Sequence, residues 1–152
     1  MTALKEAILG SPGKFGSTEK GREFSINFIT SHDGMTLNDL VSYNHKHNLE
    51  NGEENRDGHN SEFSFNCGVE GPTQDAEVLE LRRRKIRLMH FLLQVSNGIP
   101  MMLAGDEMLR TQLGNNNAYC HDSPLTWVDW TMVEHNSELV EYVGSLIDFR
   151  KK

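Results

Sequence analysis

The chain has 152 residues, of which 37% are hydrophobic and 24% are charged, and its net charge is −7 at pH 7. This length and composition predict one domain with a core of ordinary size. The negative charge disfavours a general nucleic-acid-binding role, because phosphate contacts need a basic surface. No apolar run approaches the roughly 20 residues of a membrane span, and the N-terminus lacks an apolar leader, so we expect a soluble, intracellular protein. Cys67 and Cys120 lie far apart, and we expect two reduced thiols.

The first third of the chain predicts a helix, a connection and a strand. Residues 2–9 have the apolar spacing of a short helix, and residues 11–23 predict an exposed connection. Residues 24–30 predict a strand, because apolar and polar residues alternate and Ile29 adds an apolar residue on the second face. This pattern is typical of a strand buried on both faces.

The predicted strand runs directly into His32, Asp33 and Gly34. In parallel α/β proteins, polar residues just beyond the carboxyl end of a buried strand lie where ligands bind. The alternative is that Asp33 only caps the following turn, with Gly34 supplying a permissive backbone.

A long polar segment, residues 34–74, follows. Residues 36–43 can form one or two helical turns, and most of the remainder consists of turn-forming residues. Loops of this length are usually functional or disordered. The aromatic residues Phe63 and Phe65 predict an ordered loop that packs on another part of the chain.

The clearest helix is predicted over residues 75–97, with Thr73 or Asp75 as its N-cap. Its basic run, residues 82–85, fits a solvated helix face better than a phosphate site. A second strand is predicted over residues 99–103. Strand, helix and strand form one βαβ unit, which predicts parallel strands with His32, Asp33 and Asp106 on one rim.

A second polar loop is predicted over residues 109–122, followed by a final amphipathic helix over residues 136–150. Thr131 and Glu134 have the spacing of a capping box near the start of that helix.

Three kinds of chemistry can be weighed from these loops. The histidines lack the spacing of known zinc motifs, and the acidic residues lack the pattern of a calcium loop, so no metal or other cofactor is predicted. No glycine-rich phosphate-binding motif is present. Asn, Asp, His, Arg and Trp side chains at strand ends are compatible with a carbohydrate site, and glycoside hydrolysis uses carboxylates around the scissile bond.

Five motifs resemble those of isoamylase-type glycogen and starch debranching enzymes of the α-amylase superfamily. They are FITSHDG at 28–34, NHKHN at 44–48, NGEENRDG at 51–58, GDE at 105–107 and GNNNAYC at 114–120. The resemblance implies an α/β fold in which the chain is part of a (β/α)₈ TIM barrel, about strands 7–8 with their helices and long βα loops. Residues 1–23 would be a helix remnant and connection, residues 24–97 the seventh βα unit and residues 98–152 the eighth.

The resemblance also implies roles for particular residues. Asp33 would be the third catalytic carboxylate, which stabilises the oxocarbenium-like transition state, and His32 would hydrogen-bond the sugar in the cleavage subsite. Four further residues would line the substrate cleft, namely Arg110, Asn115, Asn116 and Asn117. Asp106 and Glu107 would have a supporting or structural role.

The function implied is part of a retaining glycoside hydrolase that cleaves α-1,6 branch linkages in a branched α-glucan. In this family the nucleophilic Asp follows the fourth strand and the acid/base Glu the fifth, and neither segment is in this sequence. We therefore expect the chain alone to be inactive. The alternatives are a non-catalytic glucan-binding or assembly module, and a truncated piece with no function of its own.

The remaining expectations concern partners and location. We expect no nucleic-acid or membrane partner. We expect self-association of the isolated chain, because two strands of eight would leave both sheet edges unpaired. The expected location is the cytoplasm, or the plastid if the source is a plant or alga.

Overall fold

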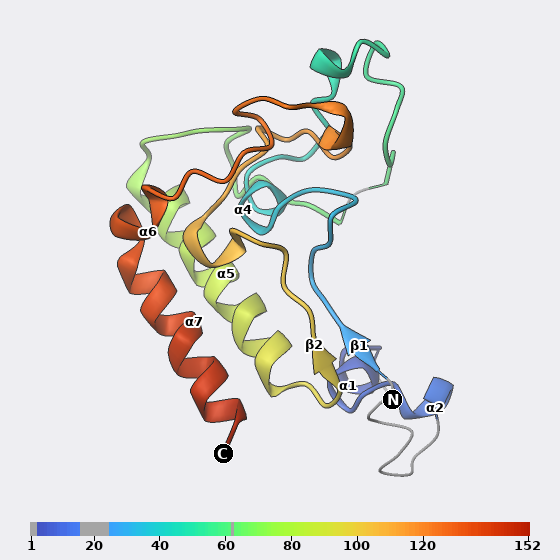
Figure 1. Cartoon of the computed structure of the whole chain (residues 1–152), viewed down its shortest axis with the longest axis vertical. Coiled ribbons are helices and arrows are strands. Elements are labelled where there is room, and N and C mark those ends of the chain that lie inside the picture. Colours follow the sequence, from blue (N-terminus) through green and yellow to red (C-terminus); the bar gives the residue numbers. More distant parts are fainter. Residues whose placement is uncertain (1–2, 16–24, 62) are drawn as a thin grey trace.

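The computed structural model describes residues 3–15, 25–61 and 63–152. In these residues, helices lie on one side of a small parallel sheet (Figure 1). The elements in chain order are α1 (Ala3–Ile8), α2 (Pro12–Phe15), β1 (Ile26–Asn27), α4 (Leu37–Leu40), the 3₁₀ helix η1 (Leu49–Asn51), α5 (Ala76–Val95), β2 (Ile99–Pro100), the 3₁₀ helices η2 (Asp106–Met108) and η3 (Ala118–Cys120), α6 (Met132–His135) and α7 (Ser137–Arg150). No helix in these described ranges is both long enough and apolar enough to cross a membrane.

Strands β1 and β2 are parallel, which confirms the βαβ prediction. Ile26 pairs with Ile99 and Asn27 with Pro100. The strands are much shorter than the predicted ranges 24–30 and 99–103, and residue 24 lies outside the described residues. In the described part of the chain, each strand has one neighbouring strand. The strands are short because hydrogen-bonded pairing ends where these two segments diverge.

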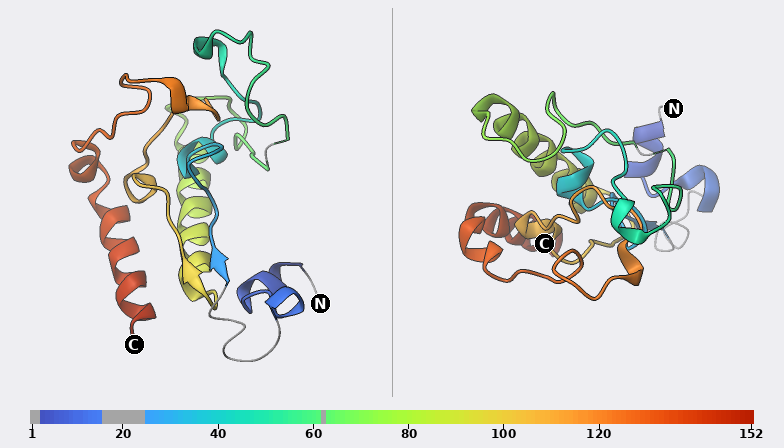
Figure 2. Two further views of the ribbon diagram at one scale, coloured as in Figure 1. Left: turned by 45° about the vertical axis from the view of Figure 1, so that its right-hand side comes forward. Right: turned by 90° about the horizontal axis from the view of Figure 1, so that it is seen from above.

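The strand residues are far more exposed than predicted. Ile26 is 58% exposed, Phe28 53% and Ile99 54%. The prediction that this strand is buried on both faces is therefore wrong for this chain. The physical reason is that helices cover one side of the strand pair, as Figure 2 shows, and no described segment covers the other.

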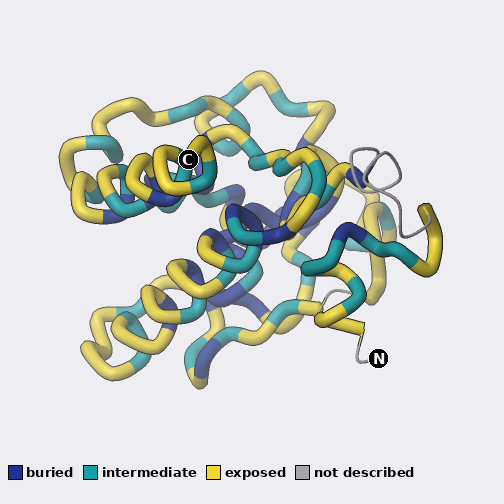
Figure 3. The backbone as a smooth tube through the Cα atoms, turned by 90° about the horizontal axis from the view of Figure 1, so that it is seen from below, coloured by how far each residue is buried: buried dark blue, intermediate teal, exposed yellow. Residues whose placement is uncertain are grey.

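The core lies where α4, α5 and α7 meet. The two long helices run side by side, and both carry buried and exposed positions in alternation along their length (Figures 1 and 3). The buried apolar cluster consists of Leu37, Val41, Cys67, Ile86, Leu139 and Val143. This cluster fixes α4, the first element after the His32–Asp33 turn, against the helical layer.

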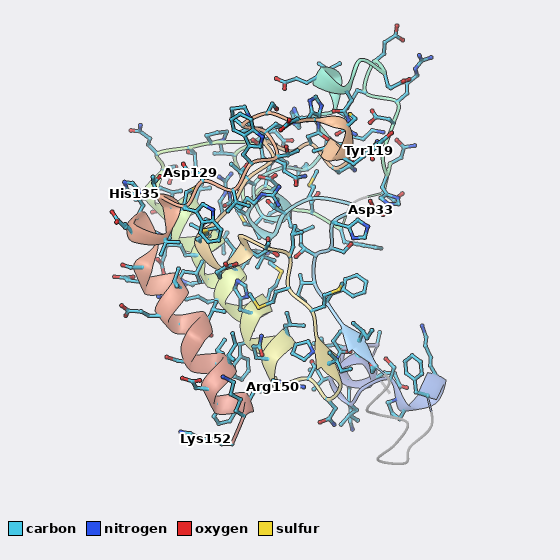
Figure 4. All side chains as sticks on the ribbon, viewed as in Figure 1. Asp33, Tyr119, Asp129, His135, Arg150 and Lys152 are labelled. Carbon is cyan, nitrogen blue, oxygen red and sulfur yellow. The ribbon has the colours of Figure 1, made fainter. Side chains whose placement is uncertain are left out.

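Both ends of α5 are capped by side chains. The Asp75 carboxylate accepts the N–H groups of Glu77 at 2.9 Å and Val78 at 3.2 Å, which confirms the N-cap prediction. At the other end, the Arg150 guanidinium donates to the carbonyl oxygens of Gln94 at 2.6 Å and Ser96 at 2.7 Å (Figure 4). The end of α7 thus satisfies carbonyls that the end of α5 leaves unpaired.

Arg82 corrects the interpretation of the basic run. Residues 83 and 84 are exposed as predicted, but Arg82 is buried and donates to the carbonyl of Gly71 at 2.9 Å and that of Asn66 at 3.0 Å. A run of four covers more than one helix turn, so one of its members must face the interior. The buried residue, Arg82, binds carbonyl oxygens of the preceding loop. The pattern of charges in the sequence does not predict these hydrogen-bond partners.

Two further predictions need correction. The hydroxyl of Thr131 donates to Asp129 at 2.6 Å and makes no capping bond, so the predicted capping box is wrong; a separate turn, α6, precedes α7. Residues 12–15, predicted as part of an exposed connection, form the short helix α2, and the rest of that connection up to residue 23 lies outside the described residues.

Candidate functional site

The His32–Asp33 turn follows β1 and is open to solvent. The His32 side chain is 87% exposed and that of Asp33 68%, and His32 Nε2 lies 3.5 Å from Asp33 Oδ2. Ser31 Oγ donates to the Asp33 carbonyl oxygen at 3.1 Å. In Figure 4, Asp33 lies on the segment that leads from β1 toward the long loops. A carboxylate and an imidazole are therefore available to a ligand at the carboxyl end of a strand.

Gly34 connects this turn to the second polar loop. Its N–H donates to the carbonyl oxygen of Asn116 at 3.1 Å. Its φ of 115° lies in the region that favours glycine, so the backbone can turn sharply directly after Asp33. The structure thereby brings His32 and Asp33 next to the asparagine-rich motif.

A pair of buried carboxylates ties the two polar loops together. Asp106, after β2, accepts the Leu37 N–H at 2.9 Å and the hydroxyl of Thr30. Asp39, after β1, accepts the N–H groups of Gln112 at 2.7 Å and Gly114 at 3.3 Å. Asp106 thus joins the turn after β2 to the start of α4, and Asp39 joins α4 to the second polar loop.

Burial sets the acidity of both carboxyl groups. It raises the pKa of Asp106 to about 6, although the hydrogen bond from Thr30 and the Leu37 N–H partly offset this effect. It likewise raises the pKa of Asp39. Asp106 lies at the same end of the strands as the His32–Asp33 turn, with its carboxylate in the interior, and these contacts agree with a supporting role.

Sequence reasoning missed Asp39, although a signal was present. Thr36 and Asp39 have capping-box spacing, and the Thr36 hydroxyl does accept the Asp39 N–H at 3.2 Å. The Asp39 carboxylate, however, turns away from its own helix toward the second loop. The sequence does not predict that a residue in a capping position bonds to a loop that lies far away along the chain.

The asparagines of the second loop are bonded to the first polar loop. Asn115 and Asn116 are buried, and Asn117 is half-buried. Asn48 Nδ2 donates to Asn116 Oδ1 at 2.8 Å, and the Asn116 N–H donates to Asn48 Oδ1 at 3.0 Å. These contacts hold the two loops together at buried positions.

Asn51 and Asp57 continue this network. Asn115 Nδ2 donates to Asn51 Oδ1 at 2.6 Å, and Asn51 Nδ2 donates to Asp57 Oδ2 at 2.6 Å. Asn117 Nδ2 donates to the same Asp57 oxygen at 2.8 Å. The hydrogen bonds from Asn51 and Asn117 lower the pKa of Asp57, so its carboxylate stays charged.

A substrate-binding role for Asn115, Asn116, Asn117 and Arg110 stays a prediction. The asparagine amides have protein partners in this structure, as described above. The Arg110 guanidinium donates to the carbonyl oxygens of Thr126 at 2.8 Å and Ala104 at 3.4 Å, which braces the loop after η2. Of the predicted residues, His32 and Asp33 are the ones presented most openly to solvent.

Glu70 orders the far part of the first loop, and sequence reasoning missed it. Its carboxylate accepts the Asn44 N–H at 2.8 Å and the Asn66 amide at 2.9 Å, and lies 3.0 Å from His47 Nε2. Burial opposes ionisation, but these bonds lower the pKa of Glu70 to about 2. The packing predicted for Phe63 and Phe65 is wrong for Phe63, which is 99% exposed, whereas Lys85 Nζ lies 4.9 Å from the centroid of the Phe65 ring.

The described residues show no group of three or more His, Cys, Asp or Glu side chains that could hold a metal ion. Cys67 is buried, Cys120 is exposed, and both are free thiols. The chemistry that this site offers is thus that of an open carboxylate and imidazole, supported by buried polar contacts.

Curated relatives match nearly all of this chain. The "Glycogen operon protein GlgX homolog" of Mycobacterium tuberculosis (strain H37Rv) is 52% identical over 144 residues, which are 95% of this chain and 20% of the relative. The "Glycogen debranching enzyme" of Enterobacter sp. (strain 638) is 49% identical over 128 residues, 84% of this chain and 19% of the relative. "Isoamylase 1, chloroplastic" of Oryza sativa subsp. japonica is 44% identical over 147 residues, 97% of this chain and 18% of the relative.

Solved pullulanases are similar in fold. The pullulanase of Anoxybacillus sp. LM18-11 complexed with maltotetraose has a TM-score of 0.69 and 26% identity, covering 99% of this chain and 17% of the pullulanase. The Bacillus acidopullulyticus pullulanase has a TM-score of 0.66 and 25% identity, covering 97% of this chain and 14% of the pullulanase.

No family model matches the chain. The chain spans about a fifth of the length of the curated relatives it matches, and these matches confirm the resemblance seen in the five motifs.

Proposed function

This chain resembles isoamylase-type debranching enzymes over most of its length, and from that premise we propose that it is part of a glycoside hydrolase that cleaves α-1,6 branch linkages in glycogen or starch-type glucans. The observation that carries the proposal is the similarity to proteins named glycogen debranching enzyme and isoamylase. The likeness to pullulanases, one of them complexed with maltotetraose, supports a branched α-glucan as substrate. Within the proposed (β/α)₈ barrel, residues 24–97 are the seventh βα unit and residues 98–152 the eighth.

Asp33 is the proposed catalytic residue of this segment. Its carboxylate is exposed at the carboxyl end of β1, where ligands bind in parallel α/β folds. In a retaining reaction, positive charge develops at the sugar ring as the glycosidic bond breaks, and a fixed carboxylate stabilises that charge. His32, beside it, donates a hydrogen bond to a sugar hydroxyl. The nucleophile and the proton donor come from other segments of the barrel.

The proposed location follows the substrate. Relatives include an isoamylase named as chloroplastic, which supports a plastid location if the source is a plant or alga. For any other source, the proposed location is the cytoplasm.

A chimera tests the proposal. The segment of the Enterobacter debranching enzyme that matches this chain is replaced by the corresponding residues of this chain, and the release of reducing ends from amylopectin is measured. We expect hydrolysis, and we expect Asp33→Asn to lower kcat about 10²–10³-fold, as for loss of one preorganised electrostatic contact. Asp148→Asn, at an exposed position on α7, is the matched control and keeps kcat.

Two outcomes would count against the proposal. A folded chimera that binds amylopectin without cleaving it would favour the non-catalytic glucan-binding module. A kcat for Asp33→Asn equal to that of the control would remove Asp33 from the catalytic machinery.

A further inference from the structure

Asn48 is fully buried, and its side-chain amide uses both its donor and its acceptor. Its Oδ1 accepts the backbone N–H of Asn116 at 3.0 Å. Its Nδ2 donates to Asn116 Oδ1 at 2.8 Å and to the carbonyl oxygen of Asp57 at 3.1 Å. The Asn48 amide therefore hydrogen-bonds to both the main chain and the side chain of Asn116 and links that residue to the first loop.

Asn116 is in turn hydrogen-bonded to the residue that follows the His32–Asp33 turn. Its carbonyl oxygen accepts the N–H of Gly34, the residue after Asp33, at 3.1 Å. Its own Nδ2 donates to the carbonyl oxygen of His59 at 3.0 Å. Asn116, whose carbonyl oxygen accepts the Gly34 N–H, is thus bonded to Asn48 through its own N–H and to Asn48 and His59 through its side chain.

We propose that Asn48 is a positioning residue for Asp33. By fixing the Asn116 backbone, it fixes the acceptor of the Gly34 N–H and with it the direction in which the Asp33 carboxylate points. Residues 44–60 of the first polar loop then set the geometry of a carboxylate that they do not themselves touch. The catalytic consequence rests on the proposed function, whereas the hydrogen-bonded link stands on the structure alone.

Residue type at this position matters because the asparagine amide offers two N–H donors and an acceptor oxygen on one short planar group. The substitution Asn48→Asp would keep the acceptor for the Asn116 N–H but would place a carboxylate oxygen against Asn116 Oδ1. Gly58 shows how closely the surroundings fit, since a Cβ there would lie 2.8 Å from Asn48 Nδ2 and closer still to Asn116 Oδ1. The backbone at Gly58 thus lies close against both amides.

The expected effect is on kcat rather than on binding. A carboxylate that stabilises a transition state must be held close to its productive position, and a misplacement of about 1 Å can cost about 10²-fold. Because Asn48 acts through two intervening residues, we expect its loss to lower kcat by about tenfold, with KM within about threefold.

Amide hydrogen exchange on the 152-residue chain tests the link directly. Asn48→Ala is expected to speed exchange of the Gly34 amide about tenfold or more, because its acceptor is released. Asn66→Ala is the matched control: this asparagine also bonds within the first loop, to Glu70 and the Gly68 N–H, but not to Asn116. Unchanged Gly34 exchange in folded Asn48→Ala would overturn the proposal.

A measurement on the unsubstituted chain decides the question even if Asn48→Ala does not fold. The amides of Gly34 and Asn116 are expected to open with equal free energies and equal urea dependence, because one linked unit holds both. Opening of Gly34 at a clearly lower free energy than Asn116 would overturn the link.

The chimera with the Enterobacter enzyme tests the catalytic consequence. Asn48→Ala is expected to lower kcat and leave KM nearly unchanged, whereas Asn66→Ala leaves both nearly unchanged. Asn48→Asp is expected to resemble Asn48→Ala, because it lacks the donor. Equal kcat in Asn48→Ala and Asn66→Ala would overturn the positioning role. An inactive unsubstituted chimera would instead count against the proposed function, and the exchange results would still decide the link between Asn48 and Gly34.

Discussion

The carboxylate of Asp106 accepts the backbone N–H of Leu37 at 2.9 Å, which joins the turn after β2 to the start of α4 after β1. Leu37 belongs to the buried apolar cluster, so this bond connects the base of the loop region to the core. Its strength depends on the charge of a carboxyl group that is 3% exposed. Stability should therefore respond to the ionisation of Asp106.

The first prediction concerns the pH dependence of stability. Burial raises the pKa of Asp106 from its ordinary 3.8 to about 6, so the folded chain binds more protons than the unfolded chain between these values. The free energy of unfolding contributed by this group is highest below pH 4 and falls as pH rises toward 6, by an amount on the order of 3 kcal/mol. Asp106→Asn keeps an acceptor for Leu37 without a charge, and is expected to remove this slope.

Urea unfolding of both chains between pH 4 and pH 7 checks this prediction. Burial lowers the pKa of His90 below its ordinary 6.5, so the contribution of this group to stability falls as pH falls below that value. The wild-type and Asp106→Asn chains share that contribution, so the difference between them isolates Asp106. A difference that is the same at every pH would contradict the raised pKa.

The second prediction concerns lower pH and Glu70. Its hydrogen bonds lower the pKa from 4.5 to about 2 despite the opposing effect of burial. Stability from this group is present above pH 4.5 and is lost as pH falls toward 2. The stability advantage of the wild-type chain over Glu70→Gln should therefore shrink in this range. Glu53→Gln, at an exposed position of the same loop, should show no comparable pH-dependent difference.

Much of the fold follows from sequence pattern because its causes are local. The apolar spacing along α5, the Asp75 cap and the turn residues near the end of the helix act within one or two helix turns. The parallel pairing of Ile26 with Ile99 follows from the strand–helix–strand order. The exposure of those strands does not follow from local pattern, because burial depends on whether other segments cover them.

The site was predictable only in part. Asp33 and His32 stand at a strand end, a position that sequence pattern can locate. Asn48, Asp39 and Glu70 each bond to a residue that is far away along the chain. The sequence separations are 68 positions for Asn48, 73 for Asp39 and 26 for Glu70. No periodicity encodes such pairs, and an asparagine that binds a sugar has the same sequence signal as one that binds another asparagine.

The third prediction compares two glycines of the first loop. Gly52 and Gly58 both have positive φ, 77° and 70°, but a Cβ at Gly52 meets no atom within 4 Å, whereas one at Gly58 would overlap Asn116 Oδ1 and lie 2.8 Å from Asn48 Nδ2. Gly52→Ala should cost about 1–2 kcal/mol for backbone strain alone. Gly58→Ala should cost about 1–3 kcal/mol more, because it overpacks the contact between the loops.

Urea unfolding of the two variants measures this difference. Since backbone strain is nearly matched, the excess cost of Gly58→Ala reports how rigidly Asn48 and Asn116 are held. Equal costs would mean that this contact yields to an added methyl group.

The last prediction is that the 152-residue chain self-associates. Four apolar side chains of the strand region are exposed, namely Ile26 at 58%, Phe28 at 53%, Ile99 at 54% and Met101 at 39%. In the described part of the chain, β1 and β2 pair only with each other, so each also has an unpaired edge. An exposed edge is a template for strand pairing, and an apolar patch gains free energy when a second copy covers it.

Sedimentation equilibrium at micromolar concentration measures the association. Phe28→Glu should weaken the association. The free energy needed to bury a charge between two copies exceeds the free energy gained from the apolar contact. Leu88→Glu is the matched control, since Leu88 is 54% exposed but lies on the helix α5. If Leu88→Glu weakened association as much as Phe28→Glu, the contact would lie on the helical layer instead. A monomer with a cooperative thermal transition at every concentration would show that the helices and loops alone stabilise the fold, and that the exposed strand face needs no cover.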